Sequence, residues 1–189
     1  MNRPLSIATL GLMTMLALAG CNPFRVNLTF VGERTALERQ VLGTYEEIGR
    51  DLASFGSVRG VNPDGSLSPP PARTTSQEAF LQAMANRQFN RDDVGTLLLV
   101  GHVREGRDGL LQPGESLSGS IPFSDVETAA IVDEENADRT TLIERLLQTT
   151  PGVTAEDRDR VAWVVATLNH DLAPPGAWLQ NEDGTWRQK

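Results

Sequence analysis

The first 21 residues form an apolar leader that ends at the only cysteine of the chain, Cys21. Arg3 places a positive charge near its start, and an apolar run interrupted only by small or hydroxyl residues extends over 5–18. A run of about 14 residues is too short to cross a hydrocarbon core, which needs about 20, and is typical of a removable signal peptide. A single cysteine excludes a disulfide framework and a cysteine zinc site, so the rest of the chain must be stabilised by its own hydrophobic core.

The last four residues of this leader, Leu-Ala-Gly-Cys, resemble the bacterial lipoprotein signal. In that signal the cysteine is lipidated and the chain is cut just before it, which implies a signal peptide over 1–20 and acyl chains on Cys21 as the membrane anchor. Such chains contribute about 0.8 kcal/mol per buried methylene, so several of them hold a protein in a membrane. Asn22 is not the aspartate that retains many such proteins in the inner membrane, so we expect a periplasm-facing protein on the outer membrane rather than the inner one. An ordinary cleaved signal followed by a free cysteine is the alternative.

The charge balance argues against nucleic acid as a partner. The chain has 17 Lys and Arg against 25 Asp and Glu, a formal net charge of −8, whereas phosphate binding needs a basic face. Its hydrophobic content of 39% is ordinary, and a chain of this length buries roughly 65 to 70% of its unfolded surface without disulfides. We therefore expect a globular fold.

Residues 21–100 form the first predicted segment after the leader, an extension with the lipid anchor, a strand and helices. Apolar and polar residues alternate over 26–30, which is the period of a half-buried strand. Thr35 and Glu38 have the spacing of a capping box, and apolar residues recur every three or four positions behind them. This pattern predicts a helix over 35–55.

Prolines and glycines divide the following residues into helices and loops. Their density over 56–73 predicts a loop. Thr75 and Glu78 repeat the capping spacing and predict a short helix, and a further helix is expected over 91–104. The glycines over 101–119 predict a second loop region.

Residues 101–189 form the second predicted segment, a helical domain with a terminal hairpin. Ser124 and Glu127 are a third capping pair, and the helix behind them extends to about residue 148. Another helix begins at Thr154 and ends before the Pro-Pro-Gly at 174–176. The predicted fold class is mainly α: a small helical domain with a short N-terminal strand and a C-terminal β-hairpin.

The hairpin is predicted from an Asp-Gly turn at 183–184 between two short runs. An isolated two-stranded hairpin is marginally stable in water, so it should dock on the helices through one face. We expect Leu179 to lie opposite Trp186.

Three segments of the second half carry a family resemblance. The first, 105–110, contains Glu105 and Gly109; the second, 132–139, is an acidic, asparagine-bearing helix that ends in an arginine. The third runs from Pro175 to the basic last residue and includes Gly-Ala-Trp-Leu-Gln and Asp-Gly-Thr-Trp. In this order they resemble the YdbL-like family, small exported proteins of Gram-negative bacteria whose domain has no assigned function.

The resemblance covers about residues 103–189. It implies a non-enzymatic accessory role in envelope maintenance, alongside AsmA-like lipid-bridging proteins. Residues 22–100 extend beyond the short members of the family, so their role is not implied. The lipid signal also departs from the simple cleaved leader of those members.

Four residues are candidate contacts for an envelope protein partner. Asn136 and Arg139 are three residues apart on one helical face, where they form either a polar patch that holds a partner or the tail hairpin, or a solvated surface. Trp178 and Trp186 on the terminal hairpin are either a binding anchor, as aromatic residues often are, or docked in the core.

No residue pattern predicts a catalytic, metal or cofactor site. His102 with Glu105 and Asp108 lacks the converging ligands of a metal centre, and His170 near a helix end suits a cation favoured by the helix dipole. No serine lies in a glycine-flanked elbow, and adjacent Glu134 and Glu135 point apart on a helix. We therefore expect a lipid-anchored binding or chaperone-like protein without a cofactor; an envelope or cell-wall hydrolase with an unrecognised site is the alternative.

Overall fold

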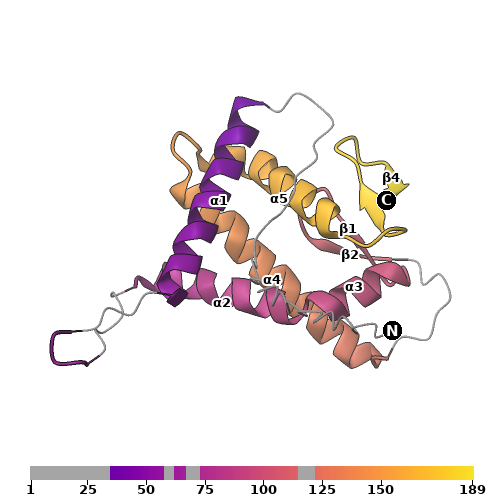
Figure 1. Cartoon of the computed structure of the whole chain (residues 1–189). Helices are drawn as coiled ribbons and strands as arrows, with labels where there is room; N and C mark the ends of the chain where they lie inside the picture. Colours follow the sequence, from indigo (N-terminus) through magenta and orange to yellow (C-terminus); the bar gives the residue numbers. More distant parts are fainter. Residues whose placement is uncertain (1–34, 58–61, 67–72, 115–121) are drawn as a thin grey trace, which may run out of the picture.

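The computed structural model describes residues 35–57, 62–66, 73–114 and 122–189. Cys21, the leader and the strand predicted over 26–30 lie outside these residues. Within them the chain is mainly helical with one small sheet built from its second half, which confirms the predicted fold class (Figure 1). In this described part, no helix combines the length and the apolar character that a membrane span requires.

The helices are α1 (Ala36–Ser57), α2 (Thr75–Phe89), α3 (Arg91–Leu99), α4 (Asp125–Thr149) and α5 (Arg158–Leu172), and a 3-10 turn, η1 (Ala155–Asp157), precedes α5. The strands are β1 (Val103–Glu105), β2 (Leu111–Pro113), β3 (Trp178–Gln180) and β4 (Trp186–Gln188).

Capping boxes fix where four of these segments begin, and the one at α1 is the predicted Thr35 pair. α4 starts at the predicted Ser124 pair, whereas Thr154, where a helix was predicted to begin, forms a box with Asp157 that caps η1 rather than α5 directly. At α2 the box is formed by Thr74 and Gln77, one residue earlier than the predicted Thr75 pair. The extended backbone of Thr74 lets its hydroxyl accept from the Gln77 amide, which is the geometry a helix start requires.

The helix predicted over 91–104 is too long. α3 ends at Leu99, and Gly101 takes a positive φ of 76°, which stops the helix. Residues 103–105 then form β1, and the predicted loop region contains β2, which pairs with β1 as a hairpin. Alternate residues of β1 are buried, so a strand covers this part of the core better than a helix.

Four helices enclose the main hydrophobic core. α2 lies along α4, and α1 packs against both α4 and α5 (Figure 1). The buried core residues are Val41, Leu42, Phe80, Leu142, Ile143, Leu146, Val161, Ala162, Val164, Val165 and Leu168. Helices from the two predicted segments, 21–100 and 101–189, therefore share one core.

The strand order of the sheet is β2-β1-β3-β4, with a parallel pair at its centre. Glu105 of β1 is paired with Leu179 of β3, so the two hairpins form one sheet. A second core lies under this sheet and consists of Val94, Leu97, Leu98, Val103, Leu111, Ala173, Ala177 and Leu179.

The predicted register of the terminal hairpin is wrong by one residue. Leu179 lies opposite Arg187, and Trp186 lies opposite Gln180. The backbone N–H of Asn181 donates to the backbone carbonyl of Thr185, so the turn contains the three residues 182–184. It is one residue longer than a two-residue Asp-Gly turn.

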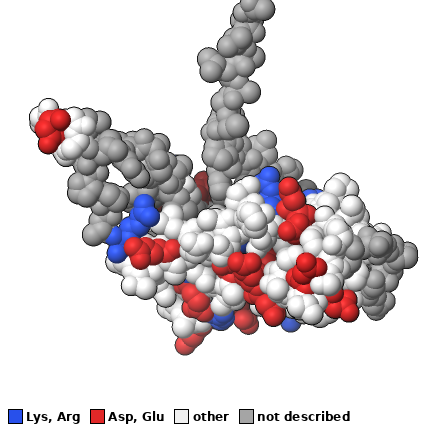
Figure 2. Space-filling model, turned by 90° about the horizontal axis from the view of Figure 1, so that it is seen from below, with Lys and Arg blue, Asp and Glu red and all other residues white. Residues whose placement is uncertain are grey.

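Acidic side chains are spread widely over the face shown in Figure 2, where basic ones are few. This distribution agrees with the formal net charge of −8.

Candidate functional site

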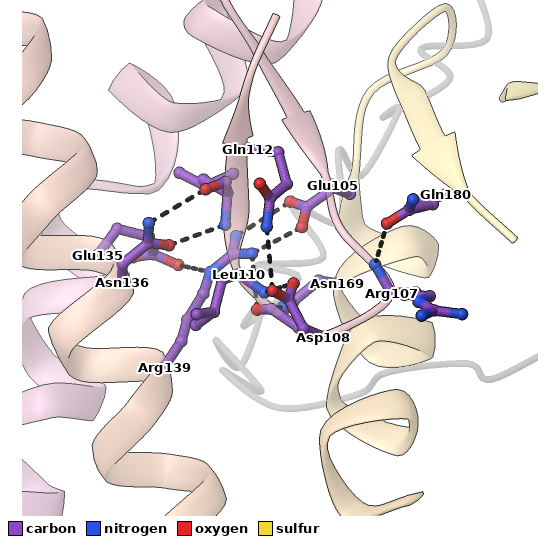
Figure 3. A network of polar contacts seen from close by, with 12 residues as sticks. Glu105, Arg107, Asp108, Leu110, Gln112, Glu135, Asn136, Arg139, Asn169 and Gln180 are labelled. Carbon is purple, nitrogen blue, oxygen red and sulfur yellow. Dashed lines mark hydrogen bonds and ion pairs between the residues drawn. The ribbon is translucent and has the colours of Figure 1, made fainter. Parts of the chain in front are cut away.

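A buried arginine connects the helices to the sheet (Figure 3). Arg139 of α4 is only 2% exposed, and its Nη1 and Nη2 donate to the two carboxylate oxygens of Glu105, at 2.6 and 3.0 Å. Its Nε donates to Glu135 one turn earlier on the same helix, at 2.6 Å. Both carboxylates are buried as well. Arg139 is thus an internal residue, neither on a solvated face nor at the surface where a partner would touch it.

Arg87 of α2 extends this group of charges. Its Nε donates to Glu135 at 3.0 Å and its Nη2 donates to the Asn169 side chain at 2.8 Å. We call Arg87, Glu105, Glu135 and Arg139 the Arg139 cluster; its two positive and two negative charges balance. Burial lowers the pKa of Arg139, but Glu105 and then Glu135 more than offset this, and the pKa ends above its ordinary value. Arg139 therefore carries its charge in the interior, as a buried cation does when it is paired.

The turn of the first hairpin is held against the same helices. The Gly109 carbonyl accepts from Arg139 Nη1 and from the Asn169 amide, both at 3.1 Å. Gly109 has a φ of 79°, and a Cβ there would lie 3.1 Å from the Ala162 carbonyl oxygen of α5. Glycine is therefore required for both the conformation and the close approach.

Asn136 binds the edge strand of the sheet. Its Oδ1 accepts from the Leu111 amide at 2.8 Å, and its Nδ2 donates to the Leu111 carbonyl at 3.1 Å. The Asn136 side chain thus provides one acceptor and one donor to Leu111, as the backbone of a neighbouring strand would. Asn136 and Arg139 thus both hold the first hairpin, formed by β1 and β2, rather than the tail hairpin formed by β3 and β4.

Trp178 and Trp186 lie on the side of the sheet that faces away from the helices. Side chains alternate along a strand, and the buried Leu179 faces the helices, so its neighbours face outward. By the same alternation and register, this outer sheet face consists of Arg104, Gln112, Trp178, Gln180, Trp186 and Gln188. The guanidinium carbon of Arg104 is 4.4 Å from the centre of the Trp186 ring, a cation–π contact. Both tryptophans are partly buried, neither in the core nor fully exposed.

The expected role of His170 as a cation at the end of α5 is wrong. Burial lowers the pKa of His170 to about 4, so the imidazole is neutral at pH 7. The cation at this helix end is Lys189, whose Nζ donates to the carbonyls of Asp171 and Ala173 at 2.8 and 2.6 Å. His102 belongs to no group of metal-ligating side chains within the described ranges.

A pocket of about 200 Å³ opens beside the Arg139 cluster. We call it the α3 pocket, because four residues of α3 line it. Its wall is formed by Tyr45, Met84, Arg87, Gln88, Arg91, Val94, Gly95, Leu98, Glu105, Glu135, Arg139, Asn169, Leu172, Ala173 and Pro174. Burial raises the pKa of Tyr45, although Arg87 lowers it, so this side chain is a neutral phenol at pH 7.

Sequence reasoning missed Glu105, Glu135 and Arg87 as members of a site. One signal was present: Asp108 and Gly109 are the same turn dipeptide that predicted the terminal hairpin. Reading it as a turn would have placed β1 and β2. No family model, curated protein or solved structure matches this chain.

Proposed function

We propose that this chain is a lipid-anchored periplasmic protein that binds another envelope protein through its outer sheet face. It acts without catalysis, as an accessory or chaperone-like factor in envelope maintenance. The observation that carries the proposal is the placement of Trp178 and Trp186 on the outward side of the sheet, away from the core that the rest of the hairpin supports.

The chemistry of the outer sheet face suits a protein partner. Tryptophan and arginine dominate the energetics of protein interfaces, and both types are present here in contact, as Arg104 and Trp186. The three glutamines of the face add hydrogen-bonding groups without charge. β4 is an edge strand of only three residues, so side chains rather than strand addition would provide most of the binding.

The leader supports the anchored location. The lipoprotein-like end of the leader places one cysteine where acylation would occur, and the sequence contains no run of about 18 apolar residues that would offer a membrane span. The net charge of −8 disfavours electrostatic adhesion to anionic lipid, so the acyl chains would recruit the protein. The YdbL-like resemblance of the second half supports an accessory role beside AsmA-like proteins.

The anchor is tested by replacing Cys21 with serine and fractionating the cells. We expect the wild-type chain in the membrane fraction and the Cys21→Ser chain outside it. If the two chains partition equally into the membrane, lipid anchoring at this residue is wrong.

The binding face is tested by site-specific photocrosslinking in cells. A photoreactive residue at Gln188 should give one defined adduct, and the same residue at Val126, which is 79% exposed on α4, should not. The adduct should disappear in a Trp178→Ala, Trp186→Ala chain whose melting curve remains cooperative. If an adduct at Gln188 persists in that chain, or none forms, the outer sheet face is not the contact surface.

A further inference from the structure

We propose that the α3 pocket binds a small carboxylic acid with a compact apolar body, such as an aromatic or branched-chain acid. The pocket lies on the helical side of the sheet, because Glu105 faces the core there and lines it. It is therefore separate from the outer sheet face, and the two proposals can fail independently.

The size of the pocket sets the size of the ligand. An apolar cavity of about 150 Å³ accepts a benzene molecule, so a pocket of about 200 Å³ has room for a ring or a branched chain with one polar group. Its base is formed by the buried Glu105, Glu135 and Arg139, and its mouth by the exposed Gln88 and Arg91. A long acyl chain would not fit inside it.

The wall of the pocket is divided between apolar and polar groups. The apolar part consists of Met84, Val94, Leu98, Leu172, Ala173 and Pro174. Leu172 is 55% exposed although it is a large apolar side chain at the pocket, so a ligand resting on it would remove apolar surface from water.

The charges of the pocket favour an anion. Three arginines and two glutamates line it, an excess of one positive charge in a chain whose net charge is −8. Both glutamates already accept hydrogen bonds from Arg139 or Arg87. The two bonds made by Arg87 use Nε and Nη2 and do not involve Nη1, and Arg91 is exposed at the mouth. A ligand carboxylate between Arg87 and Arg91 would form charge-assisted hydrogen bonds, which are about twice as strong as neutral ones.

The pocket can be filled without damage to the fold. Gly95 of α3 lines it, and a Cβ on this glycine would meet no atom within 4 Å. Gly95→Leu therefore adds a side chain into the pocket and favours the helix. Gly43→Leu is the matched control, because Gly43 also lies in a helix with open space around it but does not line the pocket.

Binding is measured by ¹⁹F NMR with 4-fluorophenylacetate as the probe, on the full chain in detergent micelles, with empty micelles as the reference. We expect saturable binding to the wild-type chain and to Gly43→Leu, and at least a tenfold loss of affinity in Gly95→Leu. Absence of saturable binding to the wild-type chain, or equal affinity in the two leucine variants, overturns the proposal.

The role of charge is tested separately with the neutral analogue 4-fluorophenylethanol and with Arg91→Gln. Both changes should weaken binding several-fold relative to the acid on the wild-type chain. Arg160→Gln is the control, since Arg160 is an exposed arginine that does not line the pocket. If the alcohol binds as tightly as the acid, or Arg160→Gln weakens binding as much as Arg91→Gln, the pocket does not select a carboxylate.

Discussion

Arg139 and Glu105 form a two-bond ion pair that is almost completely removed from water, with N–O distances of 2.6 and 3.0 Å. The pair joins the longest helix, α4, to β1, an interior strand of the sheet. Because β1 also pairs with β3 of the tail hairpin, this contact fixes the position of both hairpins on the helices. The Arg139 cluster is therefore the link between the two cores of the protein.

Removal of Arg139 should strongly destabilise the fold. Arg139→Met leaves the buried Glu105 without its cation and Glu135 with Arg87 alone, which costs about 3 to 5 kcal/mol in the free energy of unfolding. Urea denaturation followed by circular dichroism measures this loss. Arg158→Met is the control, since Arg158 pairs with Glu144 at the surface, where both side chains are nearly half exposed, and such pairs contribute at most about 1 kcal/mol. Similar losses in both variants would mean that the cluster does not hold the fold.

The tight approach of the first turn to α5 predicts a difference between two glycines. Gly109 and Gly152 both have a positive φ, so an alanine at either costs about 1 to 2 kcal/mol in backbone strain. Only at Gly109 does the new Cβ also press on a carbonyl, that of Ala162. Gly109→Ala should therefore lower the melting temperature more than Gly152→Ala, and the reverse order would contradict the packing described for this turn.

The bonds of Asn136 predict a local effect on β2. Asn136→Ala should leave the Leu111 amide and carbonyl without their side-chain partner and cost about 1 to 3 kcal/mol. Hydrogen exchange of the Leu111 amide should become much faster. In Thr141→Ala, which loses only a bond to a carbonyl of its own helix, that amide should exchange as in the wild-type chain. Unchanged exchange in Asn136→Ala would show that Asn136 does not support the strand.

His170 predicts how stability depends on pH. Its pKa is about 4 in the folded protein and about 6.5 in the unfolded chain, so between these values the unfolded chain binds more protons. The contribution of this residue to the free energy of unfolding is thus fully present above about pH 6.5 and is lost as the pH falls towards 4, by up to about 3 kcal/mol.

Urea denaturation at a series of pH values tests this dependence. His170→Gln should show a shallower slope between pH 4 and 6.5 than the wild-type chain. An identical slope in His170→Gln and the wild-type chain would assign the pH dependence to other groups.

The parts of the fold that depend only on residues close together in the sequence could be predicted from it. The helix starts at Thr35 and Ser124 follow from capping side chains three residues before their partners, and the helix predicted from the apolar stripe over 35–55 is found as α1. The terminal hairpin followed from its Asp-Gly turn. Its register did not: three residues lie between the paired Asn181 and Thr185, and this places Leu179 opposite Arg187 rather than Trp186.

The candidate site was beyond sequence reasoning for a different reason. The middle of α4 is polar nearly all round, and polarity is normally a sign of a solvated helix. Glu135 and Arg139 are nevertheless buried, because Arg87 and Glu105 reach them from α2 and β1. Charged residues are buried only when they are paired, and a pairing across elements is not visible in local spacing.

Because β3 pairs with β1, the tail hairpin covers the backbone groups along one side of β1. Without the tail hairpin, β1 would become an edge strand and offer its unpaired backbone groups to other molecules. Proteolytic loss of residues 175–189 would therefore produce a species prone to self-association through that exposed edge, and aggregation would follow clipping even though every helix remains in the chain.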